Sequence, residues 1–119
     1  MENDRFERGL KKLQEVDGNA AIEITENLGD LGKYVVEFAF GDIYSREGLS
    51  LREREIATIA MLTALGGREP QLEVHINGGL NVGLTAKEIE EIIIQTVAYA
   101  GFPTAINGMN VLKKVQAEK

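Results

Sequence analysis

The sequence predicts an all-α protein built from six to seven short helices. Apolar residues recur at spacings of three and four along most of the chain, which is the period of an amphipathic helix. Glycine and proline stand between these segments, where helices end and begin. A 119-residue chain with 44% hydrophobic and 27% charged residues is ordinary for a globular domain. We therefore expect one domain over residues 1–119.

The charge balance and the missing cysteines exclude several functional classes. The formal net charge is −6, which works against nucleic acid as a partner. The chain has no cysteine, so disulfides and thiolate catalysis are impossible. No apolar run approaches membrane-spanning length, and no signal segment opens the chain, so we expect no membrane partner and a cytoplasmic location.

The first third of the chain is expected to form three helical segments. Apolar positions at helical spacing predict a helix over 4–16, which Asp17-Gly18-Asn19 interrupts. A short helix can follow over 20–28. The segment 31–44 is apolar nearly all round, so a helix there should be buried on most sides. A strand competes, because Val, Phe and Tyr favour sheets, but no other segment could pair with it.

Two helices joined by a tight corner form the centre of the chain. The first begins at Ser50 and ends at Gly66-Gly67, because glycine accepts the left-handed conformation of a helix end. Pro70 suits the first turn of the second helix. His75, the only histidine, lies on the apolar face of that second helix, opposite a helix that carries Glu55.

The last two helices have clear start signals. Thr85 and Glu88 form a capping box, and Pro103 opens the final helix after Gly101. The inward positions of these helices are expected to be Ile89, Ile92, Ile93, Thr96, Val97, Ala100, Ala105, Ile106, Met109 and Leu112. The aromatic residues Tyr99 and Phe102 are expected in the core or at a subunit contact.

Two features indicate a homo-oligomer. Gly78-Gly79 lies inside a predicted helix, where glycine costs roughly 1 kcal/mol against alanine unless something approaches closely. Several helices are also apolar on more than one face, which would leave an exposed patch on a monomer. The alternative is a tightly packed monomer with glycines where helices cross.

The residues 31–113 resemble the carboxymuconolactone decarboxylase family. The resemblance rests on an ordered series: "RE" before an apolar helix, then P-x-L-x-x-H, G-x-T-x-x-E-I-x-E, and YAGFP-x-A-x-N. It implies an all-helical fold that assembles into homo-trimers or homo-hexamers. It also implies either decarboxylation of a lactone from the breakdown of aromatic acids, or peroxide reduction by a Cys-x-x-Cys pair before a histidine, as in the alkyl hydroperoxidase D-like branch.

The chain departs from the peroxide-reducing branch. Arg68 and Gln71 occupy the positions of its two cysteines, and neither side chain can exchange a disulfide. The histidine of the family pattern is kept as His75. The acidic residue that the resemblance implies on the preceding helix corresponds best to Glu55.

Decarboxylation gives these residues possible roles. His75 would donate a proton to the carbanion-like product, since imidazole exchanges protons near neutral pH, and Glu55 would orient the ring. An anionic substrate needs cationic groups, for which Arg68 is the first candidate, followed by Arg52 and Arg54. One histidine without cysteine offers too few ligands for a metal, so we expect neither metal nor cofactor.

Other interpretations remain open. His75 could be a core histidine bonded to a carbonyl, Glu55 a surface ion-pair partner of an arginine, and the arginines ordinary surface charge. The same scaffold could also carry an isomerase or hydrolase, or a non-catalytic oligomeric helper or binding module.

Overall fold

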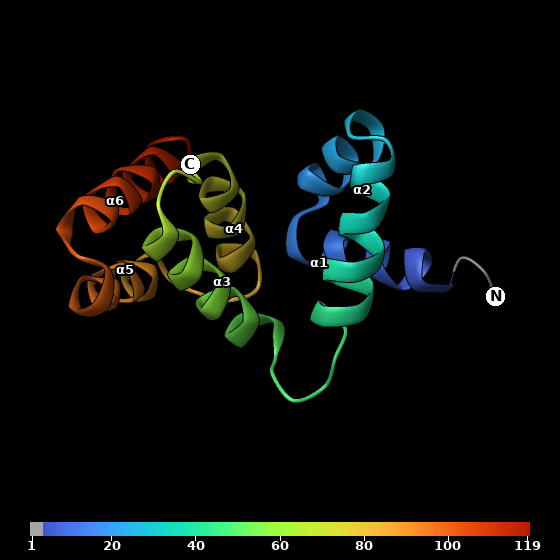
Figure 1. Ribbon diagram of the computed structural model, residues 1–119, viewed down its shortest axis with the longest axis horizontal. Helices are drawn as coiled ribbons and strands as arrows, with labels where there is room; N and C mark the ends of the chain where they lie inside the picture. Colours follow the sequence, from blue (N-terminus) through green and yellow to red (C-terminus); the bar gives the residue numbers. More distant parts are fainter. Residues whose placement is uncertain (1–3) are drawn as a thin grey trace. The chain divides into compact units, whose positions relative to one another are not determined.

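The computed structural model describes residues 4–119 and confirms the all-α prediction. Within these residues every regular element is a helix, and no strand occurs. The chain divides into two compact units, one up to Leu51 and one from Arg52 to Lys119. That the whole chain acts as one domain stays a prediction. The helices, shown in Figure 1, are α1 (Asp4–Asn27), α2 (Asp30–Tyr34), η1 (Val35–Tyr44), α3 (Leu51–Leu65), α4 (Glu69–Asn81), α5 (Ala86–Ala100) and α6 (Phe102–Ala117).

The predicted break near the start of the chain is a kink within α1. Asp17 leaves helical geometry, with φ −160° and ψ 101°. Its carboxylate oxygen Oδ1 accepts hydrogen bonds from the backbone N–H groups of Asn19 (3.0 Å) and Ala20 (3.3 Å). Asp17 therefore caps the second half of α1, as a short acidic side chain does at a helix start.

The apolar segment 31–44 is helical, as preferred over a strand, but its burial was predicted wrongly. Its second part, η1, has π-helical geometry, which is rare in helices. Val36 and Phe40 are buried. Tyr34 and Phe38 on another face are about three-fifths exposed, at 61% and 60%.

Close backbone approach holds α1 against η1. A methyl group at Gly9 would lie 1.9 Å from the carbonyl oxygen of Val36, so only glycine fits there. On the adjoining surface, Arg5 and Arg8 both form ion pairs with Asp42, at 2.6 and 3.3 Å. The hydrogen bond from Arg5 is the main reason that the pKa of Asp42 lies below its usual value.

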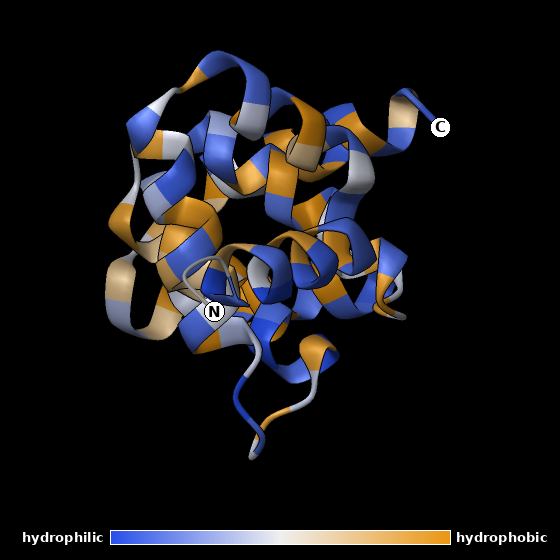
Figure 2. Ribbon diagram, turned by 90° about the vertical axis from the view of Figure 1, so that its right-hand side faces the viewer, coloured by the Kyte–Doolittle hydropathy of each residue, from blue (hydrophilic) through white to orange (hydrophobic). Residues whose placement is uncertain are grey.

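The second unit is a bundle of α3 to α6 (Figure 1). Hydrophobic and hydrophilic stretches alternate along the helical ribbons in Figure 2, as in amphipathic helices. The predicted capping box is confirmed, because Thr85 Oγ1 accepts from the N–H of Glu88 and Glu88 accepts from the N–H of Thr85. The buried core consists of Ile59, Leu72, Ile76, Leu84, Ile89, Ile93, Ala105, Val111, Leu112 and Val115.

Three expectations about side-chain placement need correction. The glycine in the middle of α4 is explained within the unit, because a methyl group at Gly79 would meet Leu84 at 2.8 Å and Ile59 at 3.1 Å. Gly79 is therefore no evidence for an oligomer. Ile106 was expected inside but is 55% exposed. Of the two places expected for Tyr99 and Phe102, the core is wrong, because they are 95% and 68% exposed, and the subunit contact stays a prediction.

No helix in the described part of the chain combines the length and the apolar character that crossing a bilayer requires.

Candidate functional site

The structure brings Glu55 and His75 together inside the second unit. Glu55 lies on α3 and His75 on α4, and the glycine corner at Gly66 and Gly67 reverses the chain between them with φ values of +70° and +72°. The ring atom Nδ1 of His75 is 2.8 Å from Oε1 of Glu55. Two residues that are distant in sequence thus form one hydrogen-bonded pair across two helices.

The pair is set into the apolar core. The Glu55 side chain is 0% exposed and that of His75 is 19% exposed. Ile59, one turn after Glu55, and Ile76, next to His75, are both fully buried. A carboxylate in such surroundings loses its hydration, so it depends on hydrogen-bond donors and nearby positive charge.

The contact between the two side chains is made by Nδ1 of the His75 ring. Where the Glu55 carboxylate is ionised it can only accept a hydrogen bond, so Nδ1 is then the donor. This contact orients the ring through Nδ1, and Nε2 is the ring nitrogen that does not take part in it. Among the described residues, the second oxygen of Glu55, Oε2, is buried and has no hydrogen-bond partner. The site therefore holds a buried acceptor beside a ring that can carry positive charge.

The three candidate arginines lie in different surroundings. Arg52, one turn before Glu55 on α3, forms an ion pair with Glu88. Arg54 is half-buried, and its Nε atom is inaccessible to solvent. Arg68 is exposed at the glycine corner and donates from Nη1 to the carbonyl of Gly66 at 2.8 Å.

The ion pair of Arg52 ties α3 to the start of α5. Glu88 accepts from Arg52 while it also closes the capping box with Thr85. The backbone hydrogen bond from Thr85 and the side-chain hydrogen bond from Arg52 hold the pKa of Glu88 below its ordinary value. The first turn of α3, which leads to Glu55, is thereby attached to the N-terminus of α5.

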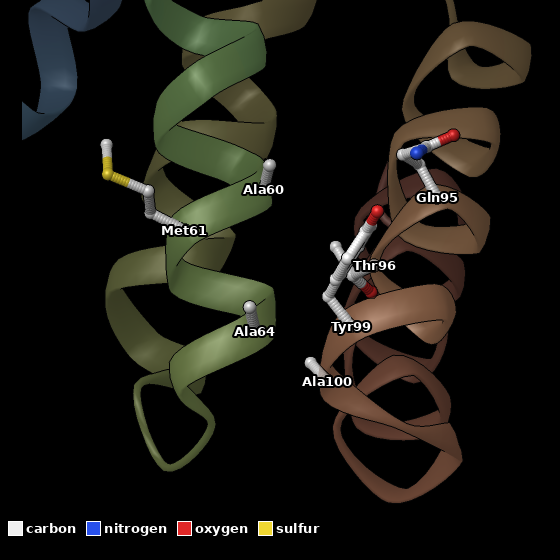
Figure 3. Close-up of a pocket in the computed structure, with 7 residues that line it drawn as sticks. All are labelled: Ala60, Met61, Ala64, Gln95, Thr96, Tyr99 and Ala100. Carbon is white, nitrogen blue, oxygen red and sulfur yellow. The ribbon is translucent and has the colours of Figure 1, made fainter.

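A pocket of about 300 Å³ lies between α3 and α5 and was not anticipated from the sequence (Figure 3). Neither Glu55 nor His75 lines it. The available signal was a pair of alanines one turn apart on α3, Ala60 and Ala64, together with the aromatic Tyr99 on α5. The full lining is Ala60, Met61, Ala64, Gln95, Thr96, Tyr99 and Ala100.

The described residues contain no cluster of three or more His, Cys, Asp or Glu side chains that could hold a metal ion. Separately, the contact between the His75 ring and the buried Glu55 carboxyl group is an arrangement that can support proton transfer.

The chain is similar to several known proteins. The chain is 34% identical over 119 residues to a 4-carboxymuconolactone decarboxylase of Acinetobacter baylyi, covering 96% of this chain and 88% of that protein. It is 28% identical over 116 residues to the nitrosuccinic acid decarboxylase npaB of Metarhizium robertsii, covering 92% and 79%. A third relative, an uncharacterized 15.0 kDa protein of Paracoccus denitrificans, is 34% identical over 86 residues, covering 71% and 64%.

Two relatives named as decarboxylases support a carboxy-lyase with decarboxylase-like function. The model of the carboxymuconolactone decarboxylase family matches residues 29–114, which include both Glu55 and His75. The chain belongs to the carboxymuconolactone decarboxylase family.

Proposed function

We propose that this protein decarboxylates a small carboxylated lactone of the kind produced in the breakdown of aromatic acids, with His75 as the proton donor. The observation that carries the proposal is the 2.8 Å contact between Nδ1 of His75 and the buried carboxylate of Glu55. The relative named 4-carboxymuconolactone decarboxylase supports the choice of substrate class.

The reaction divides into two steps. The C–C bond to the substrate carboxylate breaks, CO2 leaves, and the electron pair moves into the conjugated carbonyl. The resulting carbanion-like carbon then takes the proton from Nε2 of the protonated His75 ring, and solvent restores that proton afterwards. The Glu55 carboxylate orients the ring and stabilises its positive charge before the transfer.

Substrate binding requires a positive group, and the arginines keep the roles predicted for them. Arg68 remains the first candidate because it is exposed at the corner between α3 and α4. Arg52 is held by Glu88, so it would have to exchange that ion pair for the substrate carboxylate. Arg54 directly precedes Glu55 in the sequence and is half-buried. Neither a metal nor a cofactor is needed for these steps.

A second substrate is suggested by the relative named nitrosuccinic acid decarboxylase. A nitro group beside the carboxylate can accept the electron pair as a conjugated carbonyl does. The same imidazole could then protonate the product, so this substrate would need no change in the roles of Glu55 and His75.

The test is CO2 release from the purified protein with 4-carboxymuconolactone and, separately, with nitrosuccinate. We expect release with one of them, and a fall of about 10²–10⁴-fold in kcat for His75→Ala, which is the usual contribution of a positioned acid. Asn110→Ala, on the exposed side of α6, is the matched control. Full activity in His75→Ala would reject the assigned proton donor.

The arginines are separated by their kinetic effects. Arg68→Gln should raise KM with little change in kcat if Arg68 binds the substrate carboxylate. If KM is normal in this variant but raised in Arg52→Gln or Arg54→Gln, the arginine whose replacement raises KM is the one that binds the substrate carboxylate. Activity towards other small organic acids but neither of these substrates would favour another proton-transfer enzyme on this scaffold.

The proposal includes self-association as a homo-trimer or homo-hexamer, which the family resemblance implies, and a cytoplasmic location, which is expected from the sequence. A chain that binds the substrate without turning it over would instead favour a non-catalytic binding module.

A further inference from the structure

Arg52 and Glu88 form an ion pair that joins the first turn of α3 to the first turn of α5 within the second unit. Their side chains are 42% and 41% exposed, so water and small ions reach the pair. An ion pair with this exposure contributes little net free energy, because water screens the attraction and two long side chains lose conformational freedom. Arg52 can therefore change its partner at little cost.

The position of Arg52 on α3 connects this ion pair to the candidate site. Arg52 precedes Glu55 by three residues, and residues three apart are neighbours on a helix surface, about 5–6 Å apart at Cβ. Glu55 in turn contacts Nδ1 of His75. The base of the Arg52 side chain thus lies one helical turn from the pair to which we assign the reaction.

The two carboxylate oxygens of Glu88 have different partners. Oε1 accepts from the backbone N–H of Thr85 at 2.9 Å, whereas Oε2 accepts from Nη2 of Arg52. The backbone N–H of Glu88 also donates to Oγ1 of Thr85 at 3.0 Å. The capping box therefore holds the Glu88 carboxylate in place without help from Arg52, so an arginine that turns away leaves this carboxylate where it is.

Arg68 has a different kind of partner. Its Nη1 donates to the backbone carbonyl of Gly66 at 2.8 Å, and a carbonyl carries no net charge. A substrate carboxylate that approaches Arg68 would displace a neutral acceptor. At Arg52 it would displace another carboxylate, which makes the same charge-assisted hydrogen bond with a guanidinium group.

We propose that Glu88 is a built-in competitor of the substrate carboxylate for Arg52. Arg52 pairs with Glu88 in the empty site and exchanges it for a carboxylate of the substrate on binding, while the capping box keeps Glu88 in place. This inference rests on the proposed function, because it takes the substrate to be an anion bound beside Glu55 and His75. Glu88 is thus a positioning residue that acts through Arg52.

Succinate binding to the purified full chain tests the competition without any reaction. Succinate has two carboxylates but no group that accepts the electron pair of a broken C–C bond, so it binds without losing CO2. Isothermal titration calorimetry at neutral pH gives its Kd for each variant. Glu88→Gln should lower this Kd by about 1.5- to 5-fold, which is the factor that an exposed ion pair corresponds to. Glutamine also serves in a capping box, so the start of α5 is kept.

A purely structural role of the ion pair predicts the opposite sign. If the pair only held α3 against α5, its loss would loosen the site, and the Kd for succinate would rise or stay the same. With a substrate that the chain turns over, competition further predicts that Glu88→Gln lowers KM by the same factor and leaves kcat unchanged.

Glu91→Gln is the matched control for the loss of charge. Glu91 lies about one turn after Glu88 on α5, and its carboxylate is 3.6 Å from Nζ of Lys87. This variant also loses one negative charge and one exposed ion pair, but its Kd for succinate should equal that of the wild type. Far-UV circular dichroism verifies that each variant is folded.

A double variant shows whether the effect passes through Arg52. Arg52→Gln should weaken succinate binding, and Glu88→Gln added to it should change the Kd no further, because no arginine is left to compete for.

Four results would overturn the proposal. They are a Kd in Glu88→Gln that is not below that of the wild type, an equal fall in Glu91→Gln, unchanged binding in Arg52→Gln, and no succinate binding by any variant. These measurements do not depend on CO2 release. The expected Kd changes without CO2 release would reject the decarboxylation alone, and CO2 release with an unchanged Kd in Glu88→Gln would reject the competition alone.

Discussion

Replacing His75 with leucine while keeping Glu55 should destabilise the second unit by about 3–5 kcal/mol, which is the cost of leaving a buried charge without its partner. The structure sets this expectation. Glu55 is 0% exposed, its Oε1 accepts from His75 at 2.8 Å, and its Oε2 has no partner among the described residues. Leucine fills position 75 with a side chain of similar bulk but has no hydrogen-bond donor, so lost packing adds little to the expected destabilisation.

The double variant His75→Leu/Glu55→Leu should recover most of this loss. Replacing both members of a buried pair with apolar residues is often neutral, or even stabilising by about 1–4 kcal/mol. The difference between the single and double variants therefore measures the unpaired carboxylate and not the lost histidine packing.

The assay is urea unfolding followed by far-UV circular dichroism at one fixed protein concentration, because self-association would add its own stabilisation. Asn77→Leu is the matched control on the same helix, where a half-buried amide donates to the carbonyl of Glu73. Removing this hydrogen bond should lower the free energy of unfolding by only about 0.5–1.5 kcal/mol. A His75→Leu variant that loses less than about 1 kcal/mol would refute the argument, since the buried carboxylate would then not depend on the imidazole.

Three further predictions concern the helices. Gly9→Ala should destabilise the first unit by about 1–3 kcal/mol or more in urea unfolding, because the new methyl group would clash with the Val36 carbonyl. Gly18→Ala is the control on the same helix, and it should be neutral or stabilising because a methyl group there would meet open space. Thr85→Ala should cost about 0.5–2 kcal/mol of thermal or urea stability and Thr85→Ser much less; equal losses would argue against the hydroxyl as the cap. The pKa of Glu88 is lower in the folded chain than its unfolded pKa near 4.5. The stability that its carboxylate contributes is therefore fully present above the unfolded pKa and is lost as the pH falls through the folded pKa. Glu88→Gln should therefore be less stable than the wild type at pH 7, with the gap closing in acid, and a gap independent of pH would contradict this assignment.

The helix boundaries could be predicted well because their causes are local. The cap of α5 involves Thr85 and Glu88, which are three residues apart, and the corner after α3 depends on two glycines with positive φ. Asp17 interrupts α1 through bonds to backbone groups two and three residues away. Such signals act within one turn of the chain, so the order of the helices can be read without tertiary contacts. The π-helical form of η1 was not predicted, because its apolar residues suit an α-helix equally well.

The candidate site was reached partly by sequence and partly by resemblance. His75 stood out as the only histidine, and the family pattern directed attention to an acidic residue on the preceding helix. Their separation of 20 positions carries no local signal that the two side chains touch. The contact depends on how α3 packs against α4. The partners of the arginines, such as Glu88 for Arg52, likewise join segments far apart in sequence.

By itself the sequence determined that the protein is helical, where most helices begin and end, and that thiol chemistry is impossible. The tertiary structure decided which apolar side chains are buried: Ile93 and Tyr99 occupy one helix, yet Ile93 is 1% exposed and Tyr99 is 95% exposed. It also decided that Leu84 and Ile59 pack closely against Gly79 and that Glu55 contacts His75. The physical reason is that periodicity fixes which residues share a helix face, whereas the packing of helices distant in sequence fixes what each face touches.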